Sequence, residues 1–312
     1  MFCIRRNEKY NILFIKRIFL QKVYFMLYCL QAMSNDTNTN IDMPPKKKSY
    51  IMESKDEARR LDIKTDPQKL RQQAKWCGIR PGLRVLDVGC GPGRTTSILH
   101  SMLQPGGSIV GVDFSEDRIS YAKRLFGDTP GIDFELRDFT KPMDDLGSFD
   151  IVWVRFVLEY FRKESLDIVK NLSLNLKQDG WLCLLDLDYN CLNHYELPVQ
   201  MNNIVHRFME RLEKKHNFDP YAGRKIYSYL FDLGFSDIEM NLMAHHLIYG
   251  EISPEVEFNW IKKLEVASSH MMDIFYDYPG GYERFFADFR SFFHDPRRFT
   301  YTPIIMAKGK RP

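Results

Sequence analysis

A strand that runs directly into a glycine-rich turn is the part of this sequence best suited to binding a ligand. Residues 85–93 read VLDVGCGPG, and a helix-favouring segment follows. Glycines let the backbone turn tightly and approach a ligand closely, while the start of a helix offers unpaired N–H groups. The spacing of Gly89, Gly91 and Gly93 differs from the G-x-G-x-x-G of dinucleotide sites. Asp87, beside the turn, suits an amino-acid ammonium group better than a pyrophosphate.

This segment resembles motif I of the class I S-adenosylmethionine-dependent methyltransferases, of the UbiE-like kind that acts on small molecules. Asp113 ends the next predicted strand, roughly 20 residues beyond the turn, where a carboxylate can accept hydrogen bonds from both ribose hydroxyls. Phe114 is placed to pack on the adenine. Capping of a helix is the alternative role for Asp113, but Ser115 already fits that role.

The resemblance also assigns roles to residues that follow the third and fourth predicted strands. It implies that Asp138 accepts a hydrogen bond from the adenine amino group and that Phe139 packs nearby. An acid that only stabilises a turn is the alternative for Asp138. The strand in residues 149–160, FDIVWVRFVLEY, would end beneath the cofactor. The backbone of residues 154–156 and the Arg155 side chain are therefore candidates for cofactor binding.

The acceptor site is expected beyond the carboxyl ends of the strands. Methyl transfer from a sulfonium depends on alignment and exclusion of water, and a base is needed only where the acceptor loses a proton. We predict His194 as the best candidate for such a base, with packing in the core as the alternative. Asp188, Tyr189 and Asn190, directly after the fifth strand, are further candidates. Tyr50, Tyr160 and Tyr189 could line the pocket, with packing as the alternative for each.

Three further candidates lie late in the chain. Adjacent strand residues point to opposite faces, so at most one of His245 and His246 is expected to face a pocket. Arg297 and Arg298 could bind an acidic substrate group, but capping of carbonyls is favoured. The six cysteines contain no C-x-x-C pair, so neither a metal site nor a disulfide framework is predicted.

Alternating strands and helices are the elements that position these residues. Apolar strands alternating with helices favour an α/β fold with a doubly wound, Rossmann-like, mainly parallel sheet and helices on both faces. The resemblance implies seven strands, with the last inserted antiparallel. The predicted strands are 84–88, 108–112, 132–136, 149–154 and 181–187, and the predicted helices are 67–77, 94–103, 116–126 and 163–176.

After residue 188 the alternation breaks. Helical patterns occupy 195–216, 222–233, 254–273 and 282–293, and the last strands fall within 235–247 and 299–308. The wide gap between those strands predicts a helical cap formed by late insertions, which would narrow the acceptor pocket. We expect a methyltransferase domain over 50–312, with a cofactor-binding half at 50–188 and a substrate-side half at 189–312.

Residues 1–49 differ from the rest in composition, with nine basic and three acidic residues. We expect a disordered or mis-assigned extension over 1–32 and then a linker, within a cytoplasmic protein; a mitochondrial presequence is the second interpretation. The longest uncharged apolar run, 23–30, is far shorter than the roughly 20 residues of a membrane span, so none is expected. A helical segment from about residue 53 is expected to cover the cofactor.

The charge balance of residues 50–312 bears on the class of substrate. This part carries 35 basic and 38 acidic residues, which offers little attraction for nucleic-acid phosphates. We therefore interpret the chain as an enzyme that transfers a methyl group from S-adenosylmethionine to an O, N or C atom of a small molecule. A protein or RNA methyltransferase and a non-catalytic S-adenosylmethionine-binding protein are the alternatives. The oligomeric state stays open.

Overall fold

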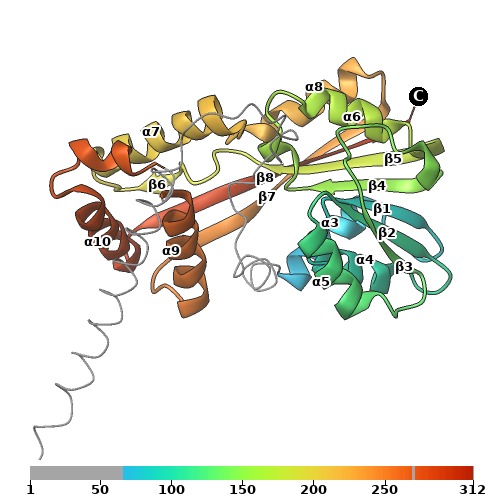
Figure 1. Ribbon diagram of the computed structural model, residues 1–312, viewed down its shortest axis with the longest axis horizontal. Helices are drawn as coiled ribbons and strands as arrows, with labels where there is room; N and C mark the ends of the chain where they lie inside the picture. The colour runs from blue at the N-terminus through green and yellow to red at the C-terminus, as the bar shows by residue number, and fades with distance from the viewer. Residues whose placement is uncertain (1–65, 269–270, 312) are drawn as a thin grey trace, which may run out of the picture. The chain divides into compact units, whose positions relative to one another are not determined.

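The computed structural model describes residues 66–268 and 271–311 (Figure 1). All of them belong to one compact unit, Tyr50–Pro312. The strands are β1 (Arg84–Val88), β2 (Ser108–Asp113), β3 (Ile132–Leu136), β4 (Phe149–Arg155), β5 (Leu176–Leu187), β6 (His194–Tyr195), β7 (Ser236–Tyr249) and β8 (Phe299–Lys310). The helices are α3 (Pro67–Trp76), α4 (Arg94–Leu103), α5 (Glu116–Phe126), α6 (Ser165–Ser173), α7 (Val199–His216), α8 (Ile226–Asp232), α9 (Pro254–Ser268) and α10 (Gly281–His294). Four short 3-10 helices complete the described elements: η1 (Asp144–Leu146), η2 (Leu158–Tyr160), η3 (Ala222–Lys225) and η4 (Met272–Asp277).

One sheet of eight strands forms the centre of the described part. The order of its strands is β3-β2-β1-β4-β5-β8-β6. Strand β7 lies outside this order and also pairs with β8. Strands β1 to β5 pair in parallel, whereas β8 runs antiparallel to both β5 and β7. The predicted parallel sheet with an antiparallel last strand is confirmed. The two-residue β6 is an addition to the seven strands that were expected.

Side chains on successive strand positions fill two separate cores, one on each face of the sheet. On β4, Ile151 and Trp153 join the core that contains residues of α3, α4 and α5. Val152 and Val154, which alternate with them, join the core that contains residues of α6 and α8. Helices therefore cover both faces, as predicted for a doubly wound sheet.

The helix starts follow the signals in the sequence. Asp66 caps α3, because its Oδ1 accepts hydrogen bonds from the backbone N–H groups of Gln68 and Lys69, at 2.9 and 3.2 Å. Ser115 caps α5, because its hydroxyl accepts from the N–H of Arg118. These two caps fix where α3 and α5 begin.

Late helices form a cap with a third core of its own. Residues of α7, α9, η4 and α10 pack together there with Ile248 of β7. On α10 the buried residues Phe285, Phe289, Phe292 and Phe293 follow the helical period, so one face of the helix enters this core. Strands β7 and β8 extend past the other strands toward these helices (Figure 1). The predicted cap is therefore present.

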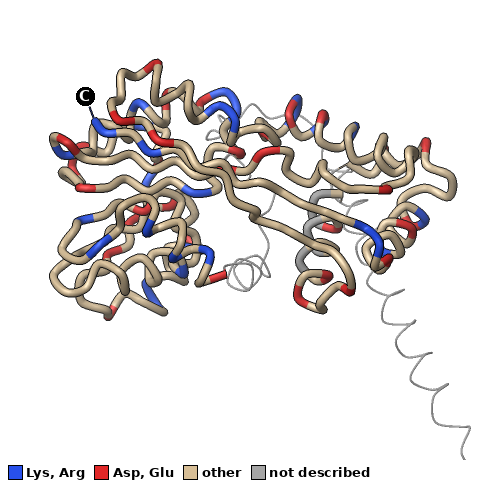
Figure 2. Tube along the Cα trace, turned by 180° about the vertical axis from the view of Figure 1, so that it is seen from behind, with Lys and Arg blue, Asp and Glu red and all other residues tan. Residues whose placement is uncertain are grey.

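Several boundaries expected from the sequence remain predictions. Residues 1–49 and the expected covering segment from residue 53 lie outside the described residues, and the division between 188 and 189 is untested. In the described part, no helix is long and apolar enough to cross a membrane. Basic and acidic residues are interspersed along the described chain (Figure 2).

Candidate active site

The glycine-rich turn after β1 has a backbone that requires glycine. Gly89, Gly91 and Gly93 have φ values of 70°, 55° and 85°, which residues with a side chain rarely adopt. The N–H groups of Gly89 and Cys90 both donate to the carbonyl of Val112, at 2.8 and 3.0 Å, and this ties the turn to β2. A Cβ atom on Gly89 would also come within 2.5 Å of Val157. The turn is therefore held closely against the ends of β2 and β4.

Asp113, at the end of β2, supports the turn directly. Its side chain is buried, its Oδ2 accepts from the N–H of Gly91 at 2.9 Å, and its Oδ1 accepts from the N–H of Ser115 at 3.0 Å. Burial raises the pKa of this carboxyl, opposed by the charge of Arg118 at 3.9 Å. The structure thus brings Asp113 and the glycine turn together, as the sequence predicted.

Asp87 lies on the other side of the turn, on β1. It is 2% exposed, and its Oδ2 accepts from the hydroxyl of Thr96 at 2.6 Å. Burial raises the pKa of Asp87 from 3.8 to about 7, while the bond from Thr96 and the charge of Arg155 oppose the shift. A carboxyl with this pKa changes its charge near neutral pH.

Arg155, at the end of β4, is held by a residue that the sequence reasoning missed. Its Nε donates to Oε1 of Gln73 on α3 at 3.0 Å, and its guanidinium lies 4.0 Å from the centre of the Phe156 ring. Burial lowers the pKa of Arg155 to about 10, opposed by the charges of Asp87 and Asp186. Gln73 is 2% exposed; a polar residue on the apolar face of α3 was the signal that could have identified it.

Three phenylalanine rings meet beside the ends of β2 and β3. Phe139 is buried, and its ring lies 6.1 Å from that of Phe114 and 5.5 Å from that of Phe161, edge to face. Phe114 is 37% exposed, so it presents an aromatic surface next to the glycine turn. Phe161 was not identified from the sequence, because it comes from the connection after β4 and reaches the cluster only through the fold.

Asp138 has the contacts of a turn-stabilising residue. Its Oδ1 accepts from both the N–H and the hydroxyl of Thr140, at 3.2 and 2.5 Å, and its Oδ2 lies 3.6 Å from the ammonium of Lys141. The residue is exposed. These contacts favour the turn alternative, while contact with an adenine amino group stays a prediction.

His194 is placed as a structural histidine, and we revise the predicted role as a base accordingly. Its Nδ1 lies 2.8 Å from the hydroxyl of Thr300 and its Nε2 lies 3.1 Å from the carbonyl of Cys191, so both ring nitrogens have partners. Burial lowers its pKa to about 4. The ring packs edge to face on Trp260 and on three phenylalanines of α10. The packing alternative accounts for all of these contacts.

His245 and His246 do not point to opposite faces as expected. The pairing of β7 with β8 shifts register between Ala244 and His246, and the two histidine rings lie 4.1 Å apart. A β-bulge breaks the alternation of side chains, so the expectation of opposite faces is wrong here, while neither histidine is among the described residues that line the cavity below. His245 packs against Phe156, and His246 against Trp260.

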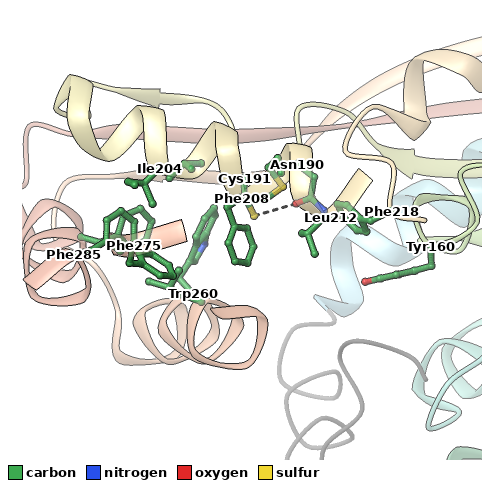
Figure 3. A pocket seen from close by; sticks show the side chains of 14 residues that line it. Tyr160, Asn190, Cys191, Ile204, Phe208, Leu212, Phe218, Trp260, Phe275 and Phe285 are labelled. Atoms are coloured by element: carbon green, nitrogen blue, oxygen red, sulfur yellow. Dashed lines mark hydrogen bonds between the residues drawn. The ribbon is translucent and has the colours of Figure 1, made fainter. Parts of the chain in front are cut away.

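A cavity lies within the cap, lined by fourteen described residues (Figure 3). Its volume is about 80 Å³. Side chains of α7, α9, η4 and α10 form most of its wall, including Phe208, Trp260, Phe275 and Phe285. None of the described lining residues is charged. The sequence named Tyr160 and Asn190 as residues that could line an acceptor pocket, and both line this cavity; the other described lining residues were not named.

The loop after β5 forms one end of this cavity. Tyr189 and Cys191 have φ values of 49° and 63°, a left-handed backbone that is unusual for residues with side chains and is often found at functional sites. Between them, Asn190 donates from Nδ2 to Oε2 of the buried Glu159 at 2.6 Å. The Cys191 thiol donates to Oδ1 of Asn190 at 3.3 Å. Both the nitrogen and the oxygen of the Asn190 amide therefore have hydrogen-bond partners where the side chain lines the cavity.

Asp188, another residue named for the acceptor site, is already paired. It forms a two-point ion pair with Arg224, with N–O distances of 2.8 and 3.0 Å. The Arg224 guanidinium also lies over the rings of Tyr189 and Tyr221. Asp188 therefore anchors the loop. Among the described residues, no cluster of His, Cys, Asp and Glu has the arrangement of a metal site.

Comparisons with known proteins agree on one family. A family model described as a methyltransferase domain matches residues 79–234. The ubiquinone biosynthesis O-methyltransferase of Bordetella avium is 31% identical over 130 residues, 40% of this chain and 51% of that protein. A demethylmenaquinone methyltransferase of Staphylococcus aureus is 31% identical over 113 residues, 36% of this chain and 46% of that protein. The chain spans about half the length of the curated relatives it matches.

The fold is also found among solved structures. The structure of a putative methyltransferase from Bacillus halodurans superposes with a TM-score of 0.51, at 16% sequence identity. The match covers 78% of this chain and 99% of that one. At this identity, the likeness concerns the fold alone.

Proposed function

Because the chain belongs to the class I S-adenosylmethionine-dependent methyltransferases, we propose that it methylates a small molecule bound between the glycine-rich turn and the cap cavity. The observation that carries this proposal is the connection after β4, where two adjacent residues face different regions. Phe161 packs with Phe114 and Phe139 beside the turn, and Tyr160 lines the cavity. Adjacent Cα atoms lie about 3.8 Å apart, so the two regions are neighbours.

The residues around the turn fit the cofactor. The glycines give the turn the left-handed backbone that holds it against β2, and Asp113 retains acceptor capacity for ribose hydroxyls, because each carboxylate oxygen has two lone-pair directions. Asp87 suits the ammonium group and Arg155 the carboxylate of the methionine part, since a guanidinium matches a carboxylate in shape and charge. Phe114 offers its exposed ring to the adenine. When bound, S-adenosylmethionine supplies a methyl group on a sulfonium for in-line displacement.

A small acceptor is supported by the form of the cap and by the relatives. A cavity walled by the cap helices shields a small molecule from water and aligns it, which is the main requirement of this reaction. One relative is named for ubiquinone biosynthesis and another for demethylmenaquinone, and both names refer to small molecules. A protein or RNA acceptor would instead need an open groove at the same edge of the sheet.

The first test is calorimetric titration of the full chain with S-adenosylmethionine. We expect saturable binding, and we expect Asp113→Ala to weaken it at least tenfold, which corresponds to about 1.4 kcal/mol. The control is Asp133→Ala, because Asp133 is an exposed acid on β3. Equal affinities for wild type and Asp113→Ala would contradict the role of Asp113. No binding to the folded chain would contradict the proposed cofactor site as a whole.

A further inference from the structure

We propose that the cap cavity binds an uncharged apolar body of the acceptor and that the polar group to be methylated lies at the Tyr160–Asn190 end. This inference rests on the proposed function, since it assigns a substrate class to the same site. The acceptor would be amphipathic, with a hydrocarbon or aromatic part several carbons long and one polar group.

The chemistry of the wall selects an apolar occupant. Among the described lining residues, Asn190 is the one with an amide and none is charged, while aromatic and aliphatic side chains form the rest. A charged or strongly polar group placed there would lose its hydration without gaining a partner. The volume of about 80 Å³ exceeds what one water needs. Cavities lined by apolar side chains accept apolar ligands.

The polarity of the two ends sets the orientation. Asn190 and Tyr160 lie at one end of the cavity, and Phe275 and Phe285 lie at the other (Figure 3). The first end adjoins the cofactor region, because Phe161 follows Tyr160 and lies 6.3 Å from Phe114, ring centre to ring centre. The second end belongs to η4 and α10, which contribute to the cap core. An amphipathic acceptor therefore points its polar group toward the cofactor.

The geometry of the polar end supports a role in positioning the acceptor. Nδ2 of Asn190 donates to Oε2 of the buried Glu159 at 2.6 Å, and this hydrogen bond fixes the orientation of the amide plane. The Tyr160 ring packs edge to face on Phe218 at 5.6 Å, which restricts its rotation. Both are polar groups held rigidly at the edge of an apolar cavity, the usual composition of a small-molecule site.

The test uses N-phenyl-1-naphthylamine, an uncharged probe whose fluorescence rises in apolar surroundings. We expect saturable binding to the full chain, weakened at least tenfold by Val205→Phe on α7 or by Leu264→Phe on α9, because either variant fills the cavity. Val199→Phe is the matched control, since Val199 lies on α7 and is 75% exposed. The control should bind the probe as wild type does.

Two further measurements keep the test decisive if one variant fails to fold. The affinity for S-adenosylmethionine should stay within twofold of wild type in every folded variant. A series of 4-alkylphenols should displace the probe from wild type, with about fourfold better displacement for each buried methylene, as expected from hydrocarbon transfer. The gain per methylene should stop at a shorter chain in the filled variants.

The outcomes separate this inference from the proposed function. Probe binding that is absent, or unchanged in both filled variants, would overturn the inference. Binding unchanged by filling would place the probe on an exposed apolar surface, such as Leu242 and Tyr249 of β7, which are 65% and 66% exposed. Failure to bind S-adenosylmethionine would instead overturn the proposed function, whatever the probe does.

Discussion

The cofactor edge of the sheet and the cap cavity are two neighbouring regions built by different means. At the edge, the structure is formed by backbone N–H groups, glycines and buried carboxylates. Its main hydrogen bonds join residues within 87–115. In the cavity, side chains from four separate elements form the wall, and the described ones carry no charge. We propose that the edge recognises fixed polar groups of the cofactor, whereas the cavity recognises the volume and apolar surface of the acceptor.

This difference teaches how one fold can keep its cofactor and change its acceptor. A substitution at the edge alters a specific hydrogen bond or a backbone angle, and few alternatives restore it. A substitution in the cap changes volume and shape, which packed cores tolerate when the total volume is kept. We therefore expect edge variants to affect cofactor affinity and cap variants to affect acceptor binding.

The largest expected effect is that of Gly89→Ala on the edge. The left-handed φ of 70° costs about 1–2 kcal/mol for alanine, and its Cβ would lie 2.5 Å from Cγ2 of Val157. Because both effects move the turn, we expect S-adenosylmethionine affinity to fall at least 100-fold in calorimetric titration. Gly82→Ala is the control: Gly82 has a φ of 83° and nothing within 4 Å of the built Cβ.

The control separates backbone strain from displacement of the turn. Gly82→Ala should lower the free energy of unfolding by about 1 kcal/mol and leave the cofactor affinity unchanged. The double variant Gly89→Ala/Val157→Ala relieves the clash but keeps the strain, so it should regain part of the lost affinity. Wild-type affinity in Gly89→Ala would show that the turn does not touch the cofactor and would remove the distinction drawn between the two regions.

A smaller effect at the edge is a pH dependence set by Asp87. Burial raises its pKa to about 7, so the carboxyl is neutral below that pH and ionised above it. The ionised form attracts the ammonium group of the cofactor. Between pH 5.5 and 7.5 we expect the Kd for S-adenosylmethionine to fall with rising pH, by up to tenfold per unit below pH 7. An α-amino group loses its proton near pH 7.7–8.0, so the range stops before that.

Two variants sharpen the pH measurement. Asp87→Asn should bind weakly with a flat profile over the same range. Thr96→Val removes the hydrogen bond that lowers the pKa of Asp87, so the midpoint should move to higher pH. The free energy of unfolding depends on pH in the opposite direction to the cofactor affinity. Because the pKa of Asp87 is raised by folding, its contribution to stability is complete below pH 3.8 and is lost as the pH rises through 7. A flat wild-type affinity profile would exclude Asp87 from the ammonium site.

The same contrast explains what could be predicted from the sequence. The turn, Asp87 and Asp113 were predicted because a strand, a tight turn and a helix start fix their relative positions over a short stretch of chain. The bond between Gln73 and Arg155 joins residues 82 positions apart, so no local pattern reports it. Phe161 likewise joins its cluster only when β2, β3 and the connection after β4 come together.

The cap shows the limits of local patterns more clearly. Helical periodicity located its helices, but the cavity depends on how their side chains meet, which periodicity does not describe. The role predicted for His194 rested on its position after β5, and packing against α10 could not be foreseen from that position. The bulge in β7 inverted the expected alternation at His245, since regular strand geometry assumes an unbroken register.

The smallest expected effect concerns Arg298, which borders the cap core. It is 1% exposed, its Nε donates to the carbonyl of Phe293 at 2.8 Å, and among the described residues Nη1 and Nη2 have no hydrogen-bond partner. Burial lowers its pKa. The charge of the exposed Asp295 opposes this shift, and replacing buried ionic groups by apolar side chains is often neutral or stabilising. We expect Arg298→Met to change the free energy of unfolding in urea by less than about 1 kcal/mol, or to raise it.

Its exposed neighbour Arg297, paired with Glu196 at 3.1 Å, provides the control Arg297→Met, which should also change the free energy of unfolding by about 0–1 kcal/mol. A loss of about 3–5 kcal/mol in Arg298→Met alone would mean that the guanidinium has a buried anionic partner, and the cap would then share the charge-based recognition of the cofactor edge.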